Sequence, residues 1–207
     1  MKRIFSFILS CMLLLGMVGC AKQKMPQQPN TDTDTASVSD TTGQKDTPTD
    51  WAYEALVVYA GSSSTDLIYT MSLNREKTGW GADKELPIYR LDQQKDVAWF
   101  YENFGNAFSL TYENEYQQSF QQAISKYGAS FYKDNSLMLT YIYAGSGSYQ
   151  FGVRDVLCEN QHFSISVEQT NDPETGTCDM AGWFLIVAVP DAIVDGCTEF
   201  GAFYVGH

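Results

Sequence analysis

Histidine is the usual base of nucleophilic catalysis, and the chain has two histidines, His162 and His207. A Ser-His-Asp or Cys-His site would have to use His162, since His207 is the last residue of the sequence. No G-x-S-x-G nucleophile motif occurs. We expect His162 to lie in a solvent-exposed turn over Cys158–His162. The sequence therefore favours a protein that is not an enzyme.

Three acidic residues, Asp172, Glu174 and Asp179, bracket a glycine-containing loop and could bind Ca²⁺ through their carboxylates. Pro173 and Cys178 do not fit the D-x-[DN]-x-[DN]-G pattern of a calcium loop. An acidic surface loop is the favoured interpretation, and calcium binding by the loop from Asp172 to Asp179 stays open. We expect no cofactor.

The cysteine at position 20 closes an export signal. Two basic residues, Lys2 and Arg3, precede an apolar stretch over Ile4–Val18, and Gly19 follows it. The ending MVGC resembles the bacterial lipobox, in which a signal peptidase cuts before a cysteine that carries a diacylglycerol. We expect residues 1–19 to be a signal peptide and Cys20 to be lipidated. This places the protein in the cell envelope, lipid-anchored to the outer face of a bacterial membrane.

The segment after this cysteine is polar. Residues 21–50 contain no aromatic residue and, apart from Met25 and Val38, nothing apolar larger than alanine. Such a segment cannot bury enough apolar surface to offset its chain entropy. We expect residues 20–50 to be a lipid-anchored disordered linker.

The charge and the aromatic residues indicate what lies beyond the linker. Acidic residues outnumber basic ones by 25 to 13, which gives a net charge of -12 and argues against nucleic-acid binding. It also argues against an electrostatic attraction to anionic lipid. All aromatic residues except Phe5 and Phe7 follow residue 50. We therefore expect one globular domain over residues 51–207.

The beginning of this domain is predicted to hold a β-hairpin and a loop. The runs Glu54–Tyr59 and Leu67–Met71 are rich in β-branched and aromatic residues and flank a Gly-Ser-rich turn. Asn74–Leu86 has no hydrophobic period, so we expect a loop there. Within it, Trp80 is flanked by Gly79 and Gly81, where a bulky side chain has few neighbours. Trp80 is a candidate for ligand or partner contact, and packing over the core is the alternative.

Two helices are expected next. Helical spacing begins at Gln93, with Asp92 as N-cap and Gly105 at the end. The second helix is expected to begin at a capping box of Asn114 and Gln117 and to end at Gly128. Its predicted apolar face consists of Tyr116, Phe120, Ile124 and Tyr127.

The rest of the domain has the pattern of strands. Trp183–Val189 is apolar on both faces and is placed centrally in the sheet, while 163–169 alternates as a half-buried antiparallel strand does. Further strands are expected at Leu137–Tyr143, 149–157 and Thr198–Val205. The sum is an α+β fold: a mostly antiparallel sheet of six or seven strands, sandwich or barrel-like, with two helices.

A glycine-rich stretch, Gly145–Ser148, has the composition of a phosphate-binding loop. It follows a strand and leads into another strand rather than a helix, so we expect a hairpin turn.

Two stretches, Phe131–Phe151 and Thr177–Val189, resemble segments of small exported proteins, many of them lipoproteins, that are distantly similar to the C-terminal domain of PrcB. Where PrcB-type domains tend to show Thr-Gly-Gly-Tyr, this chain has Ser146–Tyr149. The resemblance implies an accessory module that stabilises a surface protease complex, and it implies no catalytic residues. Tyr149 is the second candidate for partner or ligand contact.

Three cysteines lie in the domain: Cys158, Cys178 and Cys197. They are roughly twenty residues apart, too far for a zinc site. If the last four strands alternate in direction, Cys158 and Cys197 lie at one end of the sheet and Cys178 at the other. A disulfide spans at most about 7 Å between Cα atoms, whereas a seven-residue strand is roughly 23 Å long. We expect a Cys158–Cys197 disulfide and a free or intermolecularly paired Cys178; three reduced, buried thiols are the alternative.

Two hypotheses for function follow. The first is a cell-surface, non-catalytic binding or accessory module for an extracellular protein partner, which the resemblance makes a surface protease complex. The alternative is an aromatic-rich module for a glycan or small ligand, because exposed Trp and Tyr rings stack on sugars.

Overall fold

The computed structural model describes residues 51–61, 71–73, 85–113 and 117–207, and all of these belong to one compact unit. The expected signal peptide, the linker, Cys20 and Trp80 lie outside the described residues. Among the helices that the structure describes, none is long and apolar enough to cross a membrane.

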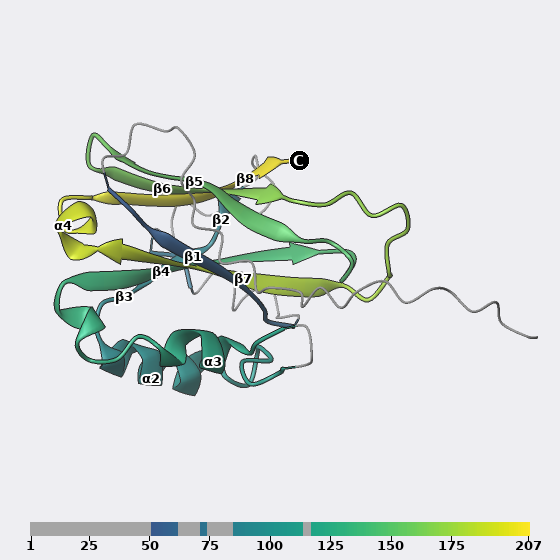
Figure 1. The fold of residues 1–207 in the computed structure, drawn as a ribbon, viewed down its shortest axis with the longest axis horizontal. Coiled ribbons are helices and arrows are strands. Elements are labelled where there is room, and N and C mark those ends of the chain that lie inside the picture. The colour runs from purple at the N-terminus through teal and green to yellow at the C-terminus, as the bar shows by residue number, and fades with distance from the viewer. Residues whose placement is uncertain (1–50, 62–70, 74–84, 114–116) are drawn as a thin grey trace, which may run out of the picture. The chain divides into compact units, whose positions relative to one another are not determined.

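The described strands form two four-stranded sheets that stack on each other (Figure 1). The inner sheet has the order β1-β7-β4-β3, with β1 at Glu54–Tyr59, β7 at Ala181–Pro190, β4 at Asn135–Ala144 and β3 at Ile88–Leu91. The outer sheet has the order β2-β8-β6-β5, with β2 at Glu85–Leu86, β8 at Glu199–Gly206, β6 at His162–Gln169 and β5 at Phe151–Glu159. Only β6 and β8 pair in parallel among these strands. The expected α+β class with mostly antiparallel strands is confirmed, as an open sandwich rather than a closed barrel.

Helices form a third layer. α2 (Gln94–Phe104) and α3 (Phe120–Ser125) cover the face of the inner sheet that points away from the outer sheet (Figure 1). A short 3₁₀ helix, η1 (Phe131–Lys133), leads into β4, and the one-turn α4 (Asp191–Val194) connects β7 to β8. The inner sheet is therefore covered on both faces.

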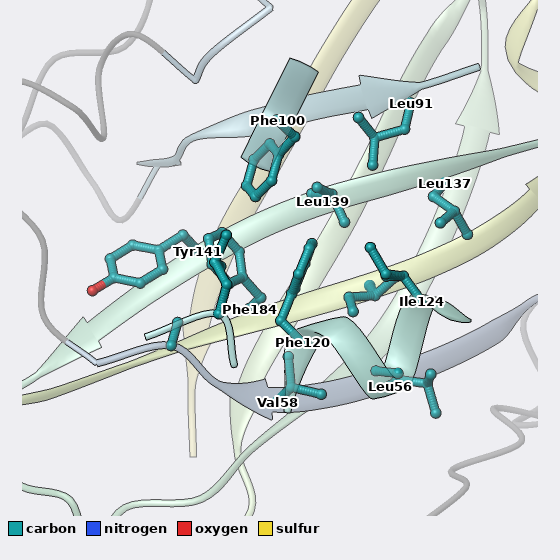
Figure 2. Packing of buried hydrophobic residues seen from close by; sticks show 14 of the residues in the cluster. Leu56, Val58, Leu91, Phe100, Phe120, Ile124, Leu137, Leu139, Tyr141 and Phe184 are labelled. Carbon is teal, nitrogen blue, oxygen red and sulfur yellow. The ribbon is translucent and has the colours of Figure 1, made fainter. Parts of the chain in front are cut away.

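This burial explains why β7 is apolar throughout. Phe184 and Ile186 point into the core under the helices, while Leu185 and Val187 point into the core between the sheets. Figure 2 shows the first of these cores, where Phe184 lies among residues from β1, β4 and both helices. β7 lies between β1 and β4, so the central position expected for this segment is confirmed.

The outer sheet is covered on one face, and its sequence alternates accordingly. Phe163, Ile165 and Val167 of β6 are buried between the sheets, whereas Ser164 and Ser166 are half-buried on the opposite face. The prediction of a half-buried strand at 163–169 is confirmed.

Both helices begin later than expected. Gln93 rather than Asp92 is the N-cap of α2, and the Asp96 carboxylate accepts hydrogen bonds from the backbone N–H groups of both residues. The helix ends before Gly105, as expected. α3 begins after Ser119, and it ends at Ser125, before the expected Gly128.

The late start of α3 has a physical reason. The Ser119 hydroxyl accepts from the Gln122 N–H at 3.2 Å, and the Gln122 side chain accepts from the Ser119 N–H at 3.0 Å. This Ser-x-x-Gln box satisfies two backbone donors, so the expected box of Asn114 and Gln117 is wrong. Residues 114–116, including Tyr116, lie outside the described residues.

The strand predictions also need corrections. Glu85 and Leu86 were expected in a loop but form β2, because they pair with Phe203 and Ala202 of β8. β3 was not expected, since it is only four residues long. β1 pairs with β7, and most of the expected hairpin partner, residues 67–70, lies outside the described part of the chain.

The turn between β5 and β6 is shorter than expected. Asn160 and Gln161 have φ angles of 51° and 66°, which is the conformation of a two-residue hairpin turn. Cys158 and Glu159 therefore complete β5, and His162 begins β6 rather than lying in a turn.

One buried hydroxyl group in the inner sheet has no hydrogen-bond partner among the described residues. Thr140 of β4 is 0% exposed, and its Oγ1 is unpaired. An unpaired buried hydroxyl costs stability, so Thr140→Val should raise the free energy of unfolding by about 1 kcal/mol in urea denaturation.

Ser136 supplies the matched control on the same strand. It is also 0% exposed, but its hydroxyl lies within hydrogen-bond distance of two carboxylates that can accept its proton, Asp92 at 2.8 Å and Asp191 at 2.5 Å. Ser136→Ala should therefore lower the free energy of unfolding by about 1 to 2 kcal/mol. A loss of stability in both variants would contradict the assignment of Thr140 as unpaired.

Candidate functional site

A pocket of about 280 Å³ lies between the two sheets, at the end of the sandwich where β4 leads into β5. β2, β4, β5, β6 and β8 all contribute to its lining. Its aromatic, acidic and amide residues are Tyr141, Tyr143, Tyr149, Phe151, Tyr204, Glu85 and Gln169. The side chains of Tyr141 and Tyr143 pack on the helix-covered face of β4, so the rings on the pocket side are those of Tyr149, Phe151 and Tyr204. The expected contact residue Tyr149 therefore lines this pocket.

The pocket forms because the chain changes sheets at Pro87. Glu85 and Leu86 pair with β8 in the outer sheet, and the residues from Ile88 onward pair with β4 in the inner sheet. Proline suits such a crossing because it has no N–H to offer to a strand partner. The pairing of β3 with β4 stops at Thr140, so residues 141–144 continue beyond β3 and line the pocket with Pro87.

The wall on the outer sheet is aromatic and fixed by contacts. The rings of Phe151 and Tyr204 lie 6.2 Å apart with an edge-to-face geometry, and Phe151 also packs on Trp183 at 5.0 Å. The Tyr204 hydroxyl donates to Gln169 Oε1 at 3.4 Å, and Gln169 Nε2 donates to the Asn171 carbonyl at 2.6 Å. The position of the Gln169 amide is thus fixed by its hydrogen bonds to Tyr204 and Asn171.

Two loops are joined by hydrogen bonds beside Tyr149. The Gly147 N–H donates to the Asp179 carboxylate at 2.5 Å, and the Thr177 hydroxyl donates to the same oxygen at 2.7 Å. Thr177 also contacts the hydroxyls of Ser146 and Ser148 at 3.1 and 3.2 Å. The prediction of a hairpin turn at Gly145–Ser148 is wrong, because this segment connects β4 of the inner sheet to β5 of the outer sheet and the two strands do not pair with each other.

Asp179, one of the three acids considered as calcium ligands, uses its carboxylate to accept these two hydrogen bonds. The hydrogen bond from Gly147, followed by that from Thr177, lowers the pKa of Asp179. Within the described residues, no group of three or more His, Cys, Asp or Glu side chains lies close enough together to hold a metal ion. Asp179 holds the loop that precedes Tyr149.

A dependence on pH follows from this lowered pKa. A carboxyl whose folded pKa lies below its ordinary 3.8 stabilises the loop contact above about pH 4, and the contact is lost as pH falls through the folded value. Hydrogen exchange at the Gly147 amide should therefore become faster, relative to the intrinsic rate, as the pH falls below 4. In Asp179→Asn this protection should be lower at neutral pH and should not change with acid. Equal protection in both proteins at pH 7 would contradict the contact.

The cysteines lie as the expected strand directions require. The sulfur atoms of Cys158 and Cys197 are 2.7 Å apart, and both lie near the Ile193 carbonyl oxygen, at 3.5 and 3.4 Å. Burial first, and then the neighbouring Cys158, raise the pKa of Cys197 to about 12. Cys178 is exposed in the loop between β6 and β7. The Cys158–Cys197 disulfide stays a prediction.

An ion-pair cluster that the sequence did not indicate ties β3 to α4. Arg90 pairs with Asp92, and it lies 2.6 Å from Asp195 and 3.7 Å from Asp191. Burial lowers the pKa of Arg90, but the hydrogen bond to Asp195 and the charge of Asp92 outweigh it and raise the pKa. We interpret the cluster as structural, because each of the three acids is paired with the Arg90 guanidinium.

His162, the histidine considered for catalysis, lies at the start of β6 with Nδ1 3.3 Å from the Glu199 carboxylate.

We compared the whole chain with family models, curated proteins and solved structures. No match was found in any of the three comparisons. The pocket beside Tyr149 is therefore the basis on which function is proposed.

Sequence reasoning found one of the pocket's residues but not the pocket. Tyr143, Phe151 and Tyr204 were recognised only as strand residues, and Glu85 was placed in a loop. Pro87 beside a short β-forming run was the available signal, because proline in such a run indicates an edge or a crossing.

Proposed function

We propose that the protein is a non-catalytic binding or accessory module, held on the outer face of a bacterial membrane through lipidated Cys20. Its pocket between the sheets receives a side chain of an extracellular protein partner. The observation that carries this proposal is the aromatic lining of the pocket at the end of the sandwich. The resemblance to PrcB-type domains supports a partner within a surface protease complex.

The dimensions and composition of the pocket favour a side chain over a whole ligand. Small-molecule sites usually measure about 300 to 1,000 Å³, so 280 Å³ lies at the lower end of that range. Protein interfaces concentrate their binding free energy where one anchor side chain fills a well-packed pocket. Tyrosine is one of the residues enriched at such positions.

A glycan or small ligand remains the second candidate, and one observation favours it. Aromatic residues that can stack on a sugar ring, such as Tyr149 and Tyr204, line the pocket together with Glu85 and Gln169, whose oxygens can accept hydrogen bonds from sugar hydroxyls.

Affinity capture from intact cells separates the two candidates. The wild-type protein should retain a stoichiometric protein partner, and Tyr149→Ala should retain at least about tenfold less of it, the loss expected when an interface hot spot is truncated. Trp99→Ala is the matched control, because Trp99 is also a partly exposed aromatic residue but lies on α2. Retention of wall polysaccharide without a protein partner would support the second candidate. Equal capture by wild type and Tyr149→Ala would contradict the assignment of this pocket.

The anchor makes a separate prediction. Cys20→Ser cannot receive the thioether-linked lipid, so most of the protein should move from the membrane fraction to the soluble fraction in the native host. The measurement is immunoblotting of both fractions. An unchanged amount in the membrane fraction would show that the lipid is not the anchor.

A further inference from the structure

We infer that the pocket selects an organic cation: an ammonium, guanidinium or quaternary ammonium group. This inference rests on the proposed function, since it names the chemistry of the group that the pocket receives. Three observations support it: the lining is aromatic, it contains one carboxylate, and hydrogen-bond donors of the lining already donate to acceptors within the protein.

The aromatic lining provides the first argument. Tyr149, Phe151 and Tyr204 contribute to one pocket of about 280 Å³. The face of an aromatic ring carries partial negative charge, so it attracts a cation within about 6 Å of its centre. Several aromatic residues around a small cavity are the arrangement that recognises quaternary ammonium groups and methylated lysines.

The charge of the lining provides the second argument. Among the described residues that line the pocket, Glu85 is the one ionisable carboxyl, and none is Lys or Arg. The whole chain is acidic, with a net charge of -12, so its field also favours a cationic partner. Both the Glu85 carboxylate and the net negative charge of the chain would repel an anionic ligand.

The hydrogen-bond donors provide the third argument. The Tyr204 hydroxyl donates to Gln169, and the Gln169 amide nitrogen donates to the Asn171 carbonyl. The Tyr204 hydroxyl and one of the two N–H groups of the Gln169 amide are therefore used within the protein, while the Glu85 carboxylate can only accept. A ligand that brings donors or positive charge fits this pocket better than one that needs donors from it.

Calorimetric titration of the full chain in detergent tests the inference. The probes are choline, its neutral isostere 3,3-dimethylbutan-1-ol, and the blocked amino acids N-acetyl-lysine amide and N-acetyl-arginine amide. We expect at least one cation to bind about tenfold more tightly than the neutral isostere, in line with the cation–π attraction of a desolvated site. Tighter binding of the blocked amino acids identifies a partner side chain as the source, and tighter binding of choline identifies a free quaternary ammonium ligand.

Two variants locate the binding. Glu85→Gln keeps the shape of the side chain and should weaken cation binding about fivefold without changing binding of the neutral isostere. Tyr149→Leu should weaken cation binding by a similar factor. Glu199→Gln is the matched control, because Glu199 lies on the same sheet at its opposite end, beside His162. The melting temperature of each variant shows that it is folded.

The outcomes separate this inference from the function on which it rests. Equal affinity for choline and its neutral isostere, no binding of any cation, or no effect of Glu85→Gln would each overturn the inference of a cation. The proposed function would then still stand if Tyr149→Ala abolished partner capture from cells. Unchanged capture by Tyr149→Ala would instead overturn the proposed function itself.

Discussion

Phe184→Ala should lower the free energy of unfolding by about 4 kcal/mol, the range observed when a buried aromatic residue is truncated. Phe184 is 0% exposed on the central strand β7. Its ring lies 4.7 to 5.7 Å from the rings of Phe100, Phe108, Phe120 and Tyr141. Truncation therefore leaves a cavity at the point where both helices meet the inner sheet (Figure 2).

Urea denaturation followed by circular dichroism measures this loss. Trp99→Ala is the control, because Trp99 is 41% exposed and packs on Tyr89 and Phe104 at the edge of the core, so its removal should cost clearly less than that of Phe184. Similar losses in the two variants would contradict the assignment of Phe184 to the centre of the core.

The second large effect concerns the cysteine pair. Cys158 and Cys197 are 39 positions apart in the sequence, and closing a loop of that length stabilises a fold by about 4 kcal/mol in the chain-entropy description. If the pair is oxidised, Cys197→Ser should lower the free energy of unfolding by about that amount, and a reductant should do the same to the wild type. The bridge would join the end of β5 to the segment between α4 and β8.

Peptide mapping of the unreduced protein by mass spectrometry identifies the pair directly. We expect a peptide that links Cys158 to Cys197 and an unlinked Cys178. Cys178→Ser is the control variant, because the thiol is exposed in a loop and its replacement should change stability by less than about 0.5 kcal/mol. Recovery of a Cys158 to Cys178 link would contradict both the pairing and the strand directions behind it.

The hydrophobic pattern of the sequence predicted the strands that are buried on both faces or on one face. β7 is apolar on both faces because it lies inside a three-layer arrangement, and β6 alternates because its sheet has one buried face. These patterns are local in the sequence, so they can be interpreted without knowing the partners of each strand. The α+β class followed from them.

The features that sequence reasoning missed depend on contacts between distant segments. β2 consists of two residues that become a strand only through pairing with Phe203 and Ala202. Asp92 has the chemistry of an N-cap, yet its carboxylate accepts from Ser136 and pairs with Arg90. The pairing of β2 with β8 and the contact of Asp92 with Ser136 each join residues more than 40 positions apart in the sequence.

The pocket was missed for the same reason. Tyr149 was identified beside a glycine-rich turn, but the residues that enclose it come from β2, β4, β6 and β8. The crossing at Pro87 and the early end of β3 leave the space that they line. Pro87 was a local signal of this crossing, but it does not indicate which strands line the space.

Site-specific photo-crosslinking on intact cells tests the central claim most directly, namely that this pocket is where the partner binds. A photoreactive phenylalanine replaces Tyr149 in one variant and Trp99, on α2, in the other. We predict that irradiation produces a discrete covalent adduct with one protein partner from position 149 and none from position 99. An adduct from position 99 with none from position 149 would contradict the claim and would place the partner on the helical layer instead.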